Sequence, residues 1–156
     1  MNHLTELQAE VVAGLRKLTA VPQLVDAVIV SAGDYYAQFG SPSGGHPNEL
    51  PFEAVGDEFL PEQHHLTNQQ RTRLTELGFS APNLDLDEPN RGGHADAHGM
   101  VSPNWHVSID VDQARMEELA AIALQAMTSA YGVPASDIEV ITVPSNPARQ
   151  GKPRKR

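Results

Sequence analysis

Three strand-like runs follow one another between residues 24 and 56, and only short turns separate them. Valine, isoleucine and aromatic residues are common in the runs, while glycine, proline, serine and aspartate fill the connections. Strands joined by such connections pair antiparallel with their neighbours. Pro51 has no backbone N–H, which favours an edge position or a bulge for the third run. The predicted strands are LVDAVIVS (24–31), YYAQF (35–39) and NELPFEAVG (48–56).

The second run divides its side chains between the two faces of the predicted sheet, because successive strand residues point to opposite sides. Tyr35, Ala37 and Phe39 share one face, and Tyr36 and Gln38 share the other. We expect Phe39 to belong to the hydrophobic core.

Two helices are predicted, one on each side of this run of strands in the sequence. Leucine and valine recur at steps of three and four residues through 4–18, which makes one apolar stripe. Thr67 and Gln70 have the spacing of a capping box at the start of a second helix. Gly78 can adopt the left-handed conformation that ends this helix, and Phe79 stands where a Schellman motif places its apolar contact.

A strand, a long helix and a last strand complete the pattern. Residues 104–111 alternate in polarity, with Trp105 on the apolar side, and Asp110 or Asp112 can cap the alanine-rich helix that follows. Residues 137–143 form a last predicted strand. The order of elements predicts an α+β fold, an antiparallel sheet of four to five strands with helices packed on it.

Residues 80–102 are predicted to form a long loop, because prolines and glycines interrupt every period in them. Within this loop, His94, Asp96 and His98 offer two imidazoles and a carboxylate, a set that could suit zinc or iron. Glycines flank the set, so no rigid element would hold a metal in place. Surface side chains are the favoured interpretation, and no metal or cofactor is predicted. A further ligand would have to come from His46 or His106.

Charge is distributed unevenly along the chain, whose formal net charge is −9. Five of the 11 basic residues lie in 144–156, so the rest of the chain has six basic against 20 acidic residues, near −14. Such a body repels nucleic acid and attracts basic partners. Proline and charge predict a disordered tail over 144–156, solvated or in contact with RNA or an acidic partner. Residues 1–143 are expected to form a single α+β domain.

No sequence motif for catalysis is present. The glycines near residue 44 lack the lysine and hydroxyl residue of a phosphate-binding loop, and no GxSxG motif occurs. The chain has no cysteine, which excludes thiol nucleophiles and disulfides. No signal-peptide pattern and no run of eighteen apolar residues occurs, so we expect a cytoplasmic protein that does not interact with membranes. The sequence predicts a protein that is not an enzyme.

Several short sequence words, in a fixed order, resemble those of a known family. Across about residues 30–135 they are similar to the actinobacterial TY-Chap family, peptide-binding chaperones that resemble type III secretion chaperones in fold. No single word is diagnostic, and the order and spacing carry the resemblance. The words are YAQF (36–39), EAVGDEFLP (53–61), LTELGFSAPN (74–83), Pro103-Asn104-Trp105 and Tyr131-Gly132-Val133-Pro134.

The resemblance implies binding of a protein or peptide client rather than catalysis. An extended peptide would pair with an exposed strand edge or lie on the apolar sheet face, with main-chain hydrogen bonds supplying affinity. The residues expected to contact it are Tyr36, Gln38, Glu53 and Trp105. Core positions remain an alternative for Tyr36 and Trp105, since amphipathic aromatics occur in cores and at interfaces. A homodimer is a further arrangement that this interpretation leaves open.

Two other functions remain open. An acidic inhibitor or immunity-type protein would block a basic partner through charge complementarity, for which the acidic body is suited. An enzyme that uses the His/Asp loop with a metal is the least favoured. Capture of many unfolded segments by the protein would indicate a chaperone, and capture of a single basic protein would indicate an inhibitor.

Overall fold

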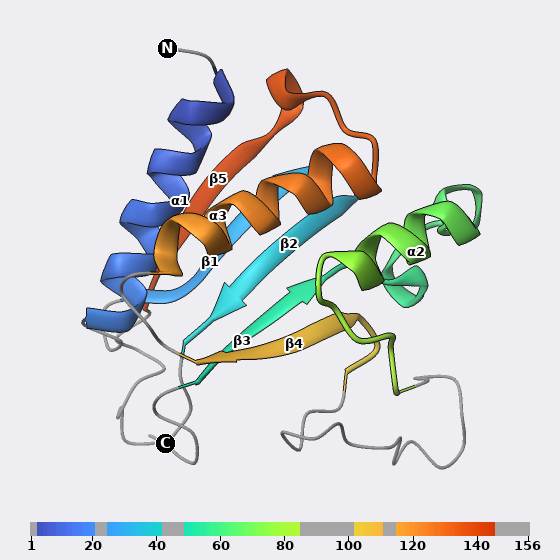
Figure 1. Cartoon of the computed structure of the whole chain (residues 1–156), viewed down its shortest axis with the longest axis horizontal. Helices are drawn as coiled ribbons and strands as arrows, with labels where there is room; N and C mark the ends of the chain where they lie inside the picture. The colour runs from blue at the N-terminus through green and yellow to red at the C-terminus, as the bar shows by residue number, and fades with distance from the viewer. Residues whose placement is uncertain (1–2, 21–24, 42–48, 85–101, 111–114, 146–156) are drawn as a thin grey trace, which may run out of the picture.

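The structure, a computed structural model, describes residues 3–20, 25–41, 49–84, 102–110 and 115–145. In these residues an antiparallel sheet of five strands packs against three α-helices (Figure 1). The strands lie in the order β4-β3-β2-β1-β5, and each neighbouring pair is antiparallel. The predicted α+β fold class is confirmed.

The first three strands form the predicted meander. β1 turns into β2 through Gly33, whose φ of 61° is in the left-handed region that glycine tolerates. The last strand returns to pair with β1, which places it at one edge of the sheet. The strands are β1 (Val25–Ala32), β2 (Tyr35–Gly40), β3 (Glu49–Ala54), β4 (Trp105–Asp110) and β5 (Glu139–Pro144).

The helices pack on the sheet and on one another. α1 (His3–Ala20) lies against β1 and β5, and α3 (Met116–Gln125) packs on α1. α3 continues into a π-helical turn (Ala126–Ala130), against which α2 (Asn68–Glu76) packs. Short 3-10 turns are Asp57–Phe59, Glu62–His64 and Ala135–Asp137.

α1 approaches the sheet closely at Gly14, where the helix crosses β1 and β5. A β-carbon at this position would lie 2.7 Å from Thr142 Oγ1 and 3.0 Å from a methyl group of Val28. The glycine therefore removes the side chain that would hold the helix away from the strands. The sequence shows Gly14 only as a slightly unfavourable helix residue, and its packing role appears only in the tertiary structure.

Both ends of α2 match the sequence prediction. The Gln70 N–H donates to Thr67 Oγ1, and the Gln70 side chain accepts from the Thr67 N–H, which completes the capping box. At the other end Gly78 has a φ of 108°, and the Phe79 N–H donates to Leu74 O at 3.1 Å. The Phe79 side chain is buried in the core, as the Schellman motif requires.

Two local predictions are wrong. β3 lies between β2 and β4 rather than at an edge, and its pairing shows no register shift that would mark a bulge. Only Phe52, Glu53 and Ala54 pair with β2, so Pro51 does not interrupt that ladder. Asp110 is the last residue of β4 and does not cap α3, whose N-cap is Arg115 without a side-chain capping bond. Most of the predicted 80–102 loop, residue Asp112 and nearly all of the predicted tail lie outside the described residues.

Candidate functional site

The sheet has two faces, and in the described part of the chain the helices cover one of them (Figure 1). Val28, Phe39 and Phe52 point to this helix-covered face and are fully buried. The positions between such residues point to the opposite side, because side chains alternate along a strand. We call this opposite side the open face. Its members include Ile29, Gln38, Glu53, Ser108, Glu139 and Ile141.

Three of the four predicted peptide-binding residues lie on the open face. Tyr36 and Gln38 come from β2, and Gln38 is the register partner of Glu53 in β3. Trp105 is the register partner of Ala54 and points to the helix-covered face, where it is 6% exposed. The structure therefore brings Tyr36, Gln38 and Glu53 together and places Trp105 in the core. Contact with a peptide stays a prediction for all four residues.

A hydrogen-bond network joins Tyr36 and Glu53 through Asn104. The Asn104 side-chain amide donates to the Tyr36 hydroxyl at 3.1 Å and to Glu53 Oε1 at 3.0 Å. Its carbonyl oxygen accepts from the Gly56 N–H at 2.9 Å, and Ser102 Oγ donates to the same Glu53 oxygen at 3.1 Å. These bonds hold residues 102–104 against β2 and β3 at one end of the open face, which we call its corner.

Asn104 and Ser102 are the site residues that sequence reasoning missed. Both are buried, at 4% and 2% exposure, although their side chains are polar. An asparagine directly before a strand was a usable signal, because its amide both donates and accepts and can serve several partners. The backbone also packs closely beside Asn104, since a β-carbon on Gly56 would lie 2.7 Å from Pro103 O.

The network and its surroundings favour neutral tyrosines. Burial raises the pKa of the Tyr36 hydroxyl above its usual value; the hydrogen bond from Asn104 acts in the opposite direction, and the Glu53 carboxylate raises it further. Burial also raises the pKa of Tyr131, whose hydroxyl donates to Val55 O at 2.7 Å. Both hydroxyls therefore act as hydrogen-bonding groups and not as ionised bases at neutral pH.

Strand β5 forms one edge of the sheet, and no described strand lies beyond it. The Ser41 N–H donates to Asp26 O at 3.2 Å, so the backbone groups of Asp26 face β2. Backbone groups alternate in direction along a strand, so every second residue of β1 from Asp26 onward bonds to β2 and the residues between them bond to β5. The same alternation turns the backbone groups of Val140 and Thr142 outward. Ile141, between them, exposes 45% of its surface on the open face. An edge of this kind can accept another strand.

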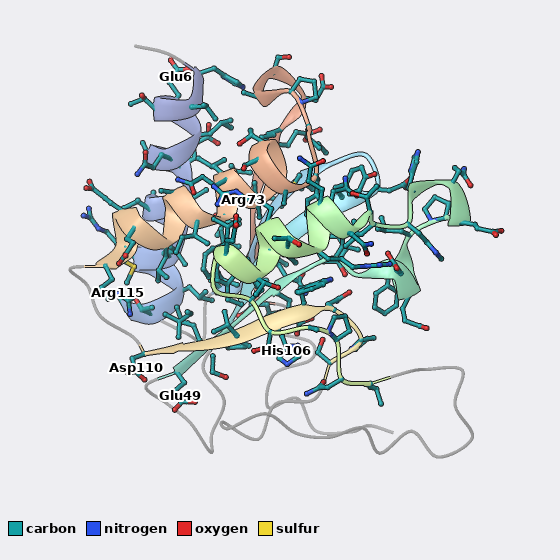
Figure 2. The ribbon with its side chains drawn as sticks, turned by 45° about the vertical axis from the view of Figure 1, so that its right-hand side comes forward. Glu6, Glu49, Arg73, His106, Asp110 and Arg115 are labelled. Carbon is teal, nitrogen blue, oxygen red and sulfur yellow. The ribbon has the colours of Figure 1, made fainter. Side chains whose placement is uncertain are left out.

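Two surface hollows lie among the helices and away from the open face. One of about 580 Å³ lies between α2 and the π-helical turn, where the Arg73 side chain donates to Ser129 Oγ (Figure 2). The other, of about 390 Å³, lies between α1 and α3 beside Gln8 and Glu117. Polar side chains line much of both, unlike the mostly apolar, enclosed pockets that hold small molecules.

The residues considered for a metal lie mostly outside the described part of the chain, namely His46, His94, Asp96 and His98. His106 is described; it is buried, and its Nδ1 lies 2.9 Å from Asn104 O. Among the described residues, no three histidine, aspartate or glutamate side chains gather closely enough to hold a metal. None of the helices in these residues is long and apolar enough to cross a membrane.

Comparison with known proteins identifies one family. Residues 2–138 match TY-Chap3, described as the T3SS (YopN, CesT) and YbjN peptide-binding chaperone 3. No curated protein and no solved structure matches the chain. The match covers most of the 156 residues and agrees with the resemblance of the sequence words and with the helix-covered antiparallel sheet. The chain therefore belongs to the TY-Chap3 family of peptide-binding chaperones.

Proposed function

We propose that the chain is a non-catalytic chaperone or adaptor that binds an extended segment of a client protein along the outer edge of β5. The family supports the class of function, since it is described as a family of peptide-binding chaperones. One observation carries the site. The backbone groups of Val140 and Thr142 point outward from an edge strand, and the exposed Ile141 lies between them.

Main-chain hydrogen bonds would supply affinity for many client sequences. Val140 and Thr142 each offer one N–H and one C=O, so an added strand could form several bonds with them. Each bond contributes roughly 0.5–1.5 kcal/mol net, so together they stabilise a complex by a few kcal/mol. Burial of Ile141 and its open-face neighbours Val143 and Ile29 would add an apolar contribution.

The opposite edge is less suited to strand addition. Next to the hydrogen-bond network, the backbone of His106 in β4 points outward from the sheet. Its N–H donates to Ser80 O at 3.1 Å, and its C=O accepts from the Ser80 N–H at 2.8 Å. An incoming strand would have to displace this bridge. β5 has no such bridge among the described residues.

The predicted contact residues take different parts in this proposal. Gln38 lies in the middle of the open face, as the register partner of Ile29 on one side and Glu53 on the other; β1 and β5 separate it from the edge, so it would not contact the added strand directly. Tyr36 and Glu53 are joined by Asn104 and would keep the adjoining corner rigid. Trp105 would support the strand from within the core.

Amide hydrogen exchange tests the site residue by residue. The probe is a peptide of alternating valine and threonine, added to the full chain and followed by NMR. We expect new protection at Val140 and Thr142, because their N–H groups point outward in the free protein. The amides of Ile141 and Val143 already face β1 and should change little. Protection confined to β4, or no binding by any extended peptide, would contradict the proposal.

A pair of matched variants separates the edge from other exposed apolar residues. Ile141→Ser removes a 45% exposed apolar side chain beside the edge, and Leu4→Ser removes a 40% exposed one from α1. Ile141→Ser should weaken the probe by about 1 kcal/mol or more, in the range of moderate interface residues, whereas Leu4→Ser should not. Equal effects of the two variants would remove β5 from the proposal.

The second candidate, an acidic inhibitor of one basic partner, is favoured by the absence of lysine and arginine from all five strands. Affinity capture with the full chain separates the two. Many unrelated extended segments would support the chaperone, and one folded basic protein would support the inhibitor.

A further inference from the structure

The strands carry acidic side chains without lysine or arginine, whereas the helices carry both signs of charge. The five strands contain Asp26, Glu49, Glu53, Asp110 and Glu139, and they contain neither lysine nor arginine. The basic residues of the described chain all lie in the helices or directly before α3. They are Arg16, Lys17, Arg71, Arg73 and Arg115.

The negative charge includes a pair of like charges placed opposite one another. Glu49 and Asp110 are register partners at the ends of β3 and β4, both on the open face, and Figure 2 shows them side by side. Facing carboxylates destabilise a sheet by several tenths of a kcal/mol. This pair adds negative charge to the open face, but it lies at the β4 edge and at the opposite end of the sheet from Glu139, too far to act on a strand added along β5.

The proposed strand-binding edge carries an acidic residue of its own. On the open face β5 presents Glu139, Ile141 and Val143 at successive alternate positions. A strand added along β5 would set its own alternate side chains beside these three. Two of the neighbouring positions are apolar and one is acidic, and Glu139 is exposed to solvent.

We infer that the client segment is cationic: an extended stretch with apolar residues at alternate positions and a lysine or arginine that lies beside Glu139. This inference rests on the proposed function and names the chemical class of its client. The occupant is a strand of another protein. A second copy that paired through its own β5 would bring no lysine or arginine to Glu139, because β5 contains neither.

Two labelled peptides test the sign of the charge. Both alternate valine and threonine, one with lysine at each end and the other with glutamate, and binding to the full chain is followed by fluorescence anisotropy. We expect the lysine peptide to bind at least about ten times more tightly, and added salt to reduce this difference. Equal affinities would overturn the inference and leave the proposed strand addition standing. If neither peptide binds, both the inference and the proposed strand addition are wrong.

Charge-reversal variants locate the effect. Glu139→Lys should lower the affinity for the lysine peptide by about tenfold and raise the affinity for the glutamate peptide, because the reversed charge lies beside the added strand. Glu76→Lys makes the same change of net charge on α2, which packs against the π-helical turn, and should alter either affinity less than about threefold. Equal effects of the two variants would show that only the net charge matters and would overturn the assignment to Glu139.

Two further measurements decide between occupants. Sedimentation of the full chain alone should give a monomer; a dimer that neither peptide dissociates would mean that a second copy holds the edge, against the inference. A synthetic peptide of residues 146–156, which carries five basic residues, should compete more weakly than the lysine peptide because it lacks the alternating apolar residues. Tighter binding by this peptide would make the chain's own tail the occupant and overturn an outside client.

Discussion

Replacement of Asn104 tests whether the polar network holds the corner of the open face. Asn104→Ala removes the acceptor for the Gly56 N–H and the donor to the Tyr36 hydroxyl and Glu53. A neutral hydrogen bond contributes about 1 kcal/mol and one to a charged group about 1.5–3 kcal/mol, and the buried Gly56 N–H is left without a partner. We expect a loss of roughly 3–5 kcal/mol in the free energy of unfolding, a large part of the stability of a domain of this size.

Denaturant unfolding measures this loss, with a surface asparagine as control. Asn68 accepts from Arg71 at 3.2 Å in an exposed position, so Asn68→Ala should change the free energy of unfolding by no more than about 0.5 kcal/mol. A loss below about 1 kcal/mol for Asn104→Ala would show that water replaces the amide, and the network would not be a structural support.

Asn104→Asp gives an independent check, because it keeps the shape and changes the charge. The new carboxylate would lie about 3 Å from Glu53, where two negative charges repel, so the shared pKa of the pair would rise above the unfolded values. Relative to the unaltered chain, the variant should therefore be least destabilised at acid pH and lose stability as the pH rises through the raised pKa. A difference in stability between the two chains that does not grow from acid to neutral pH would contradict the proximity of the two groups.

Three further predictions concern the core and its pH dependence. Gly14→Ala should destabilise the protein by about 1 kcal/mol in denaturant unfolding, because overpacking against Thr142 outweighs the better helix propensity of alanine. Adding Thr142→Ala should restore part of the lost stability, and a Gly14→Ala protein more stable than the unaltered chain would refute the close approach. Phe39→Ala should cost roughly 3–5 kcal/mol, since Phe39 is fully buried and stacks on Phe52 at 4.0 Å; a loss of under 1 kcal/mol would remove Phe39 from the core. The raised pKa of Tyr131 stabilises the fold fully below the unfolded pKa of about 10, and this contribution is lost as the pH rises above that value. In thermal melts across this range Tyr131→Phe should lose less stability than the unaltered chain, despite the missing bond to Val55, and parallel losses would contradict the assignment.

The sequence by itself determined the features that depend on neighbouring residues. The capping box at Thr67 and the left-handed Gly78 were predicted correctly, because their hydrogen bonds join residues within one or two turns of the chain. The alternation in β2 also placed Phe39 and Gln38 on opposite faces correctly, since the period of a strand is a local property. The family, too, was recognised from the order and spacing of short words along the sequence.

The tertiary structure alone decided which strands became edges and what covered each face. β5 pairs with β1 across more than a hundred residues, so its position at an edge could not be read from its own composition. The Asn104 network joins residues 51 and 68 positions apart, and Gly14 meets a strand from the far end of the chain. A periodic pattern specifies the direction in which a side chain points. The partner it meets there depends on which distant segments pack together, because burial and hydrogen bonding are satisfied by the whole fold.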